Sequence, residues 1–131
     1  MAKSETFEKG AATRREVMGE ALASKIASTT YSGKVMQQFA EYSTEAVFGM
    51  LWSRPGLDYK TRALICVISD ACNHCWPELE LHLRFARLHG WSEDELTEAL
   101  LHLGGYIGVP SAREAMIIAE RVFDEIRAED G

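Results

Sequence analysis

The stretch from Asp58 to Gly90, DYKTRALICVISDACNHCWPELELHLRFARLHG, decides the fold because its pattern predicts two helices and the turn between them. The segment from Tyr59 to about Ala71 is apolar on nearly every side after its first turn, and Asp58 is well placed to cap it. A helix of this kind is expected at the centre of a core. Pro77 suits the first turn of the second helix, which is predicted to end near His89.

Helical spacing of apolar residues continues on both sides of this pair, and no segment has the strict alternation of a half-buried strand. Two helices are predicted before the pair, from about Glu5 to Leu22 and from about Lys34 to Leu51. Two more follow it, starting at the capping boxes Ser92–Glu95 and Ser111–Glu114, and the last reaches about Ala128. A glycine-rich bend, GGYIGVP, is expected between these two. The sequence therefore predicts an all-α bundle of about six helices.

Length and composition fit one domain, because 131 residues with 47% apolar content leave room for a single core. We expect this single domain, 1–131, to have its core from Phe7 to Phe123 and short flexible termini. The net charge is −6 with acidic and basic residues interspersed, which argues against a nucleic-acid partner. The start, MAKSETFEKG, has no apolar targeting segment, and no apolar run approaches the roughly 18 residues that span a bilayer. A soluble, cytoplasmic protein without a membrane partner is expected.

Glu78 and His82 are a candidate acid–base pair. They lie four residues apart in the predicted second helix, so their side chains would lie one turn above each other. A carboxylate beside an imidazole orients the ring and favours its charged form, which suits a group that moves protons near neutral pH. The same spacing also fits an ordinary surface ion pair, and spacing alone leaves both interpretations open.

Cys72 and Cys75 stand in C-N-H-C, a spacing compatible with a redox-active dithiol. The total of three cysteines is odd, which argues against a structural disulfide framework. A zinc site is also disfavoured, because these cysteines with His74 and His82 would have to splay unnaturally to make a tetrahedron. The two cysteines are therefore either a reactive dithiol or inert residues at a helix end, and no metal is expected.

Three motifs carry a family resemblance. Trp52–Arg62 reads WSRPGLDYKTR, Glu78–His82 reads ELELH, and Tyr106–Ala112 reads YIGVPSA. With these motifs, the chain from about Phe7 to Phe123 resembles the carboxymuconolactone decarboxylase family, near the gamma-carboxymuconolactone decarboxylases of aromatic catabolism. The resemblance implies an all-α fold that assembles as a ring-shaped homo-oligomer, a trimer or hexamer. It also implies a carboxy-lyase without metal or organic cofactor, which converts the small anionic lactone 4-carboxymuconolactone to 3-oxoadipate enol-lactone in the beta-ketoadipate pathway.

The implied reaction gives roles to individual residues. Departure of carbon dioxide leaves electrons that spread onto the lactone carbonyl, so the site needs cations for the acetate arm, donors at that carbonyl and an acid for the ring carbon. His82 is the expected proton donor, with Glu78 orienting it or sharing the transfer. Each further candidate also fits a structural role, as a loop cation, a core aromatic or a satisfied polar group. The expected substrate-binding residues are Arg54 for the acetate carboxylate, Trp52 as an apolar wall, and His102 and Tyr106 as donors to the lactone.

The resemblance extends to a second chemistry. The alkylhydroperoxidase D branch of the same superfamily uses a CxxC followed by a histidine for thiol redox reactions. In that branch the histidine follows the second cysteine by four residues and a glutamate precedes the first by twelve, where this chain has Leu79 and Lys60. A thiol peroxidase or disulfide reductase that uses Cys72 and Cys75 is the alternative function, and a non-catalytic binding or assembly protein is the third.

Overall fold

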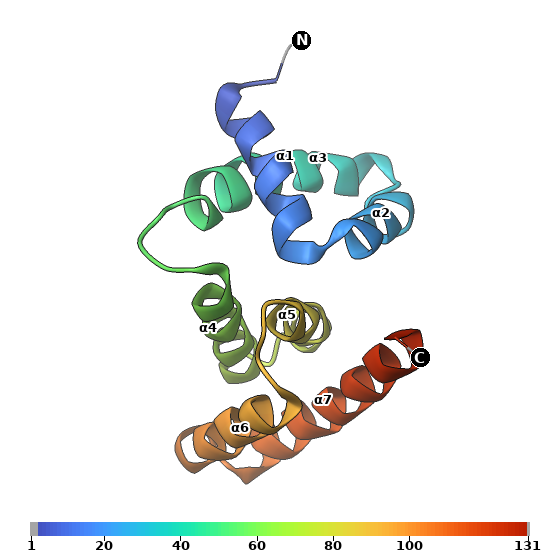
Figure 1. The fold of residues 1–131 in the computed structure, drawn as a ribbon. Coiled ribbons are helices and arrows are strands. Elements are labelled where there is room, and N and C mark those ends of the chain that lie inside the picture. Colours follow the sequence, from blue (N-terminus) through green and yellow to red (C-terminus); the bar gives the residue numbers. More distant parts are fainter. Residues whose placement is uncertain (1–2, 131) are drawn as a thin grey trace. The chain divides into compact units, whose positions relative to one another are not determined.

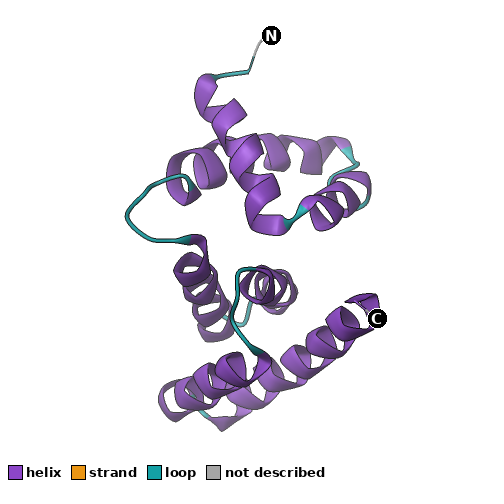
Figure 2. Cartoon of the chain, viewed as in Figure 1, coloured by secondary structure: helices purple, strands orange, loops and turns teal. Residues whose placement is uncertain are grey.

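The computed structural model describes residues 3–130, and all regular structure in that range is helical (Figures 1 and 2). The elements group into two compact units, Met1–Tyr59 and Lys60–Gly131. The prediction of an all-α fold is confirmed, but six helices were too few, because the described chain has seven α-helices and one π-helix. The flexible termini predicted at the chain ends fall partly on Met1, Ala2 and Gly131, which lie outside the described residues. In chain order the elements are α1 (Glu5–Met18), α2 (Glu20–Ser28), α3 (Lys34–Ser43), η1 (Thr44–Trp52), α4 (Tyr59–Cys72), α5 (Trp76–Leu88), α6 (Glu93–Ile107) and α7 (Val109–Asp130).

In the N-terminal unit, α1 packs against η1 (Figure 1). A glycine from each helix, Gly10 and Gly49, lies at this contact. A Cβ atom on Gly10 would lie 2.8 Å from the backbone nitrogen of Gly49, and one on Gly49 would lie 2.9 Å from Cγ2 of Thr6. Only glycine lets two backbones approach so closely. The buried apolar side chains of this unit are Val17, Met18, Ala23, Phe48 and Trp52.

Two predicted helices of this unit differ from the structure. The helix predicted from Glu5 to Leu22 is broken at Gly19, whose φ of 84° ends α1 and separates it from α2. The second helix has the predicted limits, but its latter part is π-helical. At its end, the Ser53 N–H donates to the carbonyl of Phe48, five residues back, at 3.1 Å. Ser53 Oγ also lies 2.8 Å from Thr13 Oγ1, which joins the end of η1 to α1.

In the C-terminal unit, α7 packs along both α5 and α6. The predicted helix from Tyr59 to Ala71 is confirmed as α4, although only one face of it is buried: Ala63 and Val67 are fully enclosed, whereas Ile65 is 54% exposed. The prediction that Pro77 lies in the first turn of the next helix is also confirmed. Besides α4, the core of this unit consists of Leu79, Leu83, Phe85 and Ala86 from α5, Leu96 and Leu100 from α6, and Ala115, Ile118, Ala119, Val122 and Phe123 from α7.

One of the two predicted capping boxes is present. Ser92 Oγ accepts the N–H of Glu95 at 3.0 Å, and the Glu95 side chain accepts the N–H of Ser92 at 2.9 Å. The box predicted at Ser111 is wrong, because α7 already begins at Val109 and α6 continues to Ile107. The bend is confined to Gly108, whose φ of 102° requires glycine. The glycine-rich segment before it is helical rather than bent.

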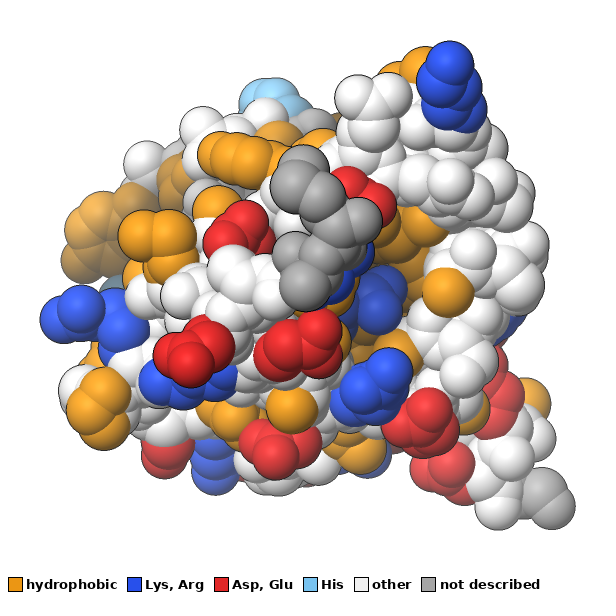
Figure 3. Space-filling model, turned by 90° about the horizontal axis from the view of Figure 1, so that it is seen from above, with side chains coloured by type: hydrophobic (Ala, Val, Ile, Leu, Met, Phe, Trp, Pro, Cys, Tyr) orange, Lys and Arg blue, Asp and Glu red, His pale blue; other side chains and the backbone are white. Residues whose placement is uncertain are grey.

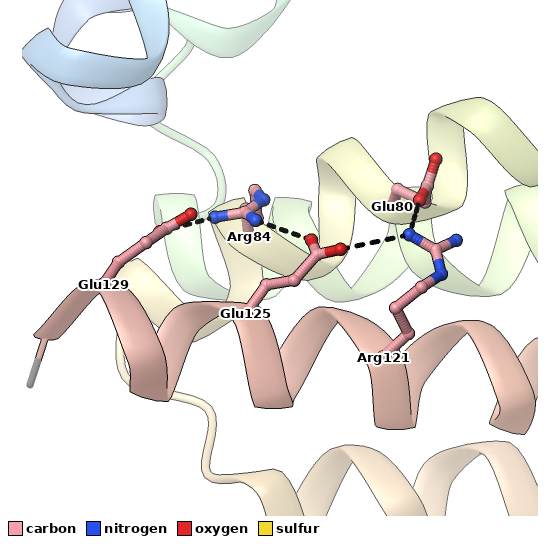
Figure 4. Close-up of polar contacts among 5 residues, drawn as sticks. All are labelled: Glu80, Arg84, Arg121, Glu125 and Glu129. Carbon is pink, nitrogen blue, oxygen red and sulfur yellow. Dashed lines mark hydrogen bonds and ion pairs between the residues drawn. The ribbon is translucent and has the colours of Figure 1, made fainter.

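A network of ion pairs ties α5 to α7 (Figure 4). Arg84 of α5 donates to Glu125 at 3.0 Å and to Glu129 at 2.9 Å, and only 22% of its side chain is exposed. Arg121 of α7 pairs with Glu125 and reaches back to Glu80 of α5. Shared carboxylates make such a network more effective than isolated surface pairs, which contribute about 0–1 kcal/mol each. The network fixes the register of α5, the helix that carries Glu78 and His82.

Apolar side chains reach the surface among charged ones (Figure 3). In the C-terminal unit, five large apolar residues are at least half exposed, and Tyr106 and Val109 exceed three quarters. These five exposed residues are Ile65, Leu88, Leu101, Tyr106 and Val109.

No helix in residues 3–130 has the length and apolar character needed to cross a membrane.

Candidate active site

His82 is hydrogen-bonded to a carboxylate that the sequence did not single out. Its Nδ1 lies 2.5 Å from Oδ2 of Asp70, a residue near the end of α4. The Asp70 side chain is 10% exposed and that of His82 is 21% exposed. Burial of an acid at this level is costly unless it is paired. The imidazole of His82 is its partner, and the two form the best-enclosed acid–base pair among the described residues of the C-terminal unit.

The surroundings of the pair fix both of its members. The His82 and Phe85 rings pack in a T-shaped arrangement, with a centroid distance of 5.1 Å and an interplanar angle of 74°. Phe85 is itself 1% exposed, so this wall is part of the core. The backbone carbonyl of Asp70 accepts the N–H of Cys75 at 2.9 Å, which closes the turn between α4 and α5. The turn and the core together hold the carboxylate and the ring against each other.

Glu78 was expected to be the carboxylate beside the His82 ring, but Asp70 has that position. Glu78 lies one turn before His82 on α5, as the spacing predicted, but its side chain is exposed. Within residues 3–130, no hydrogen bond or ion pair joins Glu78 to His82; Asp70 is the carboxylate at the ring. A role for Glu78 in proton transfer stays a prediction.

The turn that carries the cysteines is held by His74 rather than by a sulfur bridge. Cys72, Cys75 and Cys66 are free thiols, with Cys72 exposed and Cys75 half-buried. His74 adopts a left-handed conformation with φ of 57°, and its Nε2 lies 2.8 Å from Oγ of Ser111. Its ring stacks on Trp76 at 5.2 Å. The described residues contain no group of three or more His, Cys, Asp or Glu side chains placed to hold a metal.

We expect Cys66 to resist alkylation while Cys72 reacts. Burial, and to a smaller extent the negative charge of Asp70, raises the pKa of Cys66 from 9.0 to about 11. Its thiol therefore stays protonated at about pH 8, and the reactive thiolate forms only as the pH approaches that pKa. Iodoacetamide followed by peptide mass mapping should label the exposed Cys72 and leave Cys66 unmodified. Equal labelling of both would contradict the burial of Cys66.

The expected substrate-binding residues divide between the two units. His102 and Tyr106 lie side by side on α6, with ring centroids 5.3 Å apart, and both are exposed. In the N-terminal unit, Trp52 is buried and stacks on Phe48 at 6.0 Å, while Arg54 is exposed in the loop after η1. The structure thus places the His102 side chain beside that of Tyr106, and the His82 side chain beside that of Asp70.

A groove of about 530 Å³ lies between α6 and α7, away from the predicted site residues. Its apolar floor includes Leu100, Met116 and Phe123, and Arg113 and Glu120 are among its charged residues. None of the residues that the sequence singled out lines it. The groove therefore does not coincide with the Asp70–His82 pair.

Comparison with known proteins establishes the family. Residues 37–121 match the carboxymuconolactone decarboxylase family. A nitrosuccinic acid decarboxylase of Metarhizium robertsii is 36% identical over 92% of this chain and 82% of its own length. A 4-carboxymuconolactone decarboxylase of Acinetobacter baylyi is 32% identical over 96% of this chain and 92% of its own length. The chain belongs to the carboxymuconolactone decarboxylase family and is a carboxy-lyase.

Proposed function

We propose that this enzyme decarboxylates a small dicarboxylate without a cofactor, and that its substrate is 4-carboxymuconolactone, which it converts to 3-oxoadipate enol-lactone. The observation that carries the proposal is the likeness, over more than nine tenths of the chain, to two proteins that are both named decarboxylases. The reaction belongs to aromatic catabolism through the beta-ketoadipate pathway, and a cytoplasmic location is part of the proposal.

Nitrosuccinic acid is the second candidate substrate, because the relative named for it is 36% identical to this chain. The two candidates share their reactive part. In each, the departing carboxylate sits on a carbon that also bears a carboxymethyl arm. The electron pair left by carbon dioxide spreads onto oxygen, of the nitro group in one and of the lactone carbonyl in the other. Because the substrate itself accepts the electrons, either reaction can proceed on electrostatics and proton transfer alone.

His82 is the proposed proton donor to the carbon that becomes saturated. The His82 imidazole is partly exposed and lies beside the apolar Phe85 ring. It can therefore contact a small substrate while most of the imidazole surface is shielded from water. Glu78 is available one turn away on the same helix to exchange protons with solvent. The remaining proposed roles are binding of the carboxymethyl arm by Arg54, an apolar surface at Trp52, and donors to the delocalised oxygen at His102 and Tyr106.

The proposal is tested by measuring carbon dioxide release from enzymatically prepared 4-carboxymuconolactone and from nitrosuccinic acid with the purified protein. Turnover of the lactone with little or none of the nitro acid is expected. The opposite preference would move the assignment to the second candidate. Failure to release carbon dioxide from either would overturn the proposal, and consumption of hydrogen peroxide in the presence of a thiol reductant would then point to the dithiol chemistry of Cys72 and Cys75.

We also propose that the enzyme works as a ring-shaped homo-oligomer, a trimer or hexamer. The support is apolar surface: Ile65 on the exposed face of α4, Leu101 on α6 and Val109 at the start of α7 are each more than half exposed. Contact with a second copy of the chain would remove this apolar area from water, which favours association. Sedimentation velocity at micromolar concentration should give a multiple of the 14.6 kDa chain mass. A monomer would contradict the proposal.

A further inference from the structure

We propose that Asp70 is a positioning residue for His82: it keeps the hydrogen on Nδ1, so that Nε2 is the nitrogen that delivers the proton to substrate. The inference rests on the proposed decarboxylation. It adds a residue that neither the family resemblance nor the spacing of the motifs indicated, and it replaces Glu78 as the group that orients the ring.

The geometry identifies which nitrogen Asp70 binds. The 2.5 Å contact joins Oδ2 of Asp70 to Nδ1 of His82. A carboxylate in its ionised form only accepts hydrogen bonds, so Nδ1 must donate. In the neutral ring the single hydrogen then sits on Nδ1 and Nε2 carries a lone pair. In the charged ring Nε2 carries the second hydrogen, which is the one free to leave.

This assignment gives a balanced proton transfer. The bond between the substrate carbon and its carboxylate breaks and releases carbon dioxide, and the electron pair spreads into the acceptor group. That pair then forms a new C–H bond with the hydrogen of Nε2. The Nε2–H bond breaks and leaves its electrons on nitrogen, so His82 becomes neutral while Nδ1–H still donates to Asp70. A proton from solvent restores the charged ring before the next turnover.

The placement of Asp70 fits such a role better than a purely structural one. Taken as a whole residue, Asp70 is 7% exposed. The other buried residues of its helix, Ala63, Val67 and Ala71, are apolar. A buried pair between a carboxylate and a cation is often no more stabilising than an apolar replacement of the same size. Helix α5 is separately tied to α7 by the ion pairs of Arg84 and Glu80. The Asp70 contact joins α4 to α5, and at its α5 end it is made to Nδ1 of the His82 ring, so it orients the ring.

The test combines kinetics with the state of the ring. Asp70→Asn keeps the shape of the side chain but removes its charge, and its amide can donate to Nδ1 and drive the hydrogen to Nε2. We expect kcat to fall about 100-fold with KM changed less than about threefold. Glu80→Gln is the matched control, because it removes a carboxylate from an ion pair on the same helix. Its kcat is expected to stay within about twofold of wild type.

Nitrogen-15 NMR of the histidine side chains reads the ring directly and needs no substrate. In the wild type at a pH where His82 is neutral, the hydrogen should be on Nδ1; in Asp70→Asn it should move to Nε2. Wild-type His82 with its hydrogen on Nε2, or an Asp70→Asn enzyme with full kcat, would overturn the inference. If the wild type releases no carbon dioxide from either substrate, the proposed function fails, whereas the NMR result in the wild type still decides how Asp70 holds the ring. The wild-type measurement also stands if the variant does not fold.

Discussion

Replacing His82 with Gln is expected to lower the rate of carbon dioxide release by about 10²–10⁴-fold, the usual contribution of a positioned acid or base. Glutamine is close to histidine in length, and its amide can still donate to Oδ2 of Asp70, so the buried carboxylate keeps a partner. The glutamine amide has no proton to release near neutral pH, so the delocalised intermediate would have to take its proton from water. Single-turnover measurements with saturating 4-carboxymuconolactone separate this loss from a change in binding.

The control for His82→Gln is the double variant Cys72→Ser, Cys75→Ser, which should keep its turnover. The two thiols stand at the ends of α4 and α5, and the turn between them is held by His74 and by the backbone bond from Cys75 to Asp70. Serine preserves both. The reverse result, with an active His82→Gln variant and an inactive serine variant, would contradict the acid–base mechanism and support the thiol alternative. Circular dichroism of both variants checks that the helices persist.

The C-terminal unit was largely predictable because its signals are local. The apolar segment that became α4, the proline at the start of α5 and the Ser92–Glu95 box each depend on residues within one or two helical turns. The box expected at Ser111 failed for two reasons, one local and one distant in sequence. Val109 and Pro110 already continue the chain in helical form after Gly108, and the Ser111 hydroxyl bonds to His74, 37 residues earlier.

The N-terminal unit was harder to predict because glycine has two opposite uses there. Gly19 breaks a charged helix through its positive φ, whereas Gly10 lies inside α1 where another backbone approaches. Sequence does not distinguish these uses, since each depends on what the rest of the fold places nearby. The π-helical geometry of η1 is similarly hidden, because a pattern of apolar residues fits a helix of either pitch.

Of the two hydrogen-bonded residues at the candidate site, the sequence singled out one. His82 stood out through the motif that contains it, and Glu78 was chosen as its partner because contacts at i,i+4 can be read from sequence. The actual partner is twelve residues earlier, on the other side of a turn. A usable signal was present: Asp70 is the acid in a helix that is mostly apolar after its first turn, where a lone carboxylate would be costly to bury. That signal indicates a buried partner but not which residue it is.

Replacing Gly10 with Ala is expected to destabilise the protein by about 3 kcal/mol or more, at the upper end of overpacking costs. The added methyl would lie 2.8 Å from the Gly49 nitrogen, 3.0 Å from the Gly49 Cα atom and closer still to the Thr44 carbonyl oxygen. All three are backbone atoms, so no side chain can rotate away, and α1 must move from η1 as a body. That movement would open the packing around Val17 and Phe48, where close-packed apolar side chains stabilise the N-terminal unit.

The matched control for Gly10→Ala is Gly105→Ala, which should raise the stability of the protein instead of lowering it. Gly105 lies inside α6, and its added methyl group would have no atom within 4 Å apart from its chain neighbours and the backbone of its own helix, so alanine mainly reduces the freedom of the unfolded chain. That effect stabilises by about 0.4–1 kcal/mol. Urea unfolding followed by tryptophan fluorescence reports on both units, because Trp52 belongs to the first and Trp76 and Trp91 to the second. If Gly10→Ala proves as stable as the wild type, α1 and η1 cannot cross as closely as their glycines indicate, and the packing described for this unit would have to be revised.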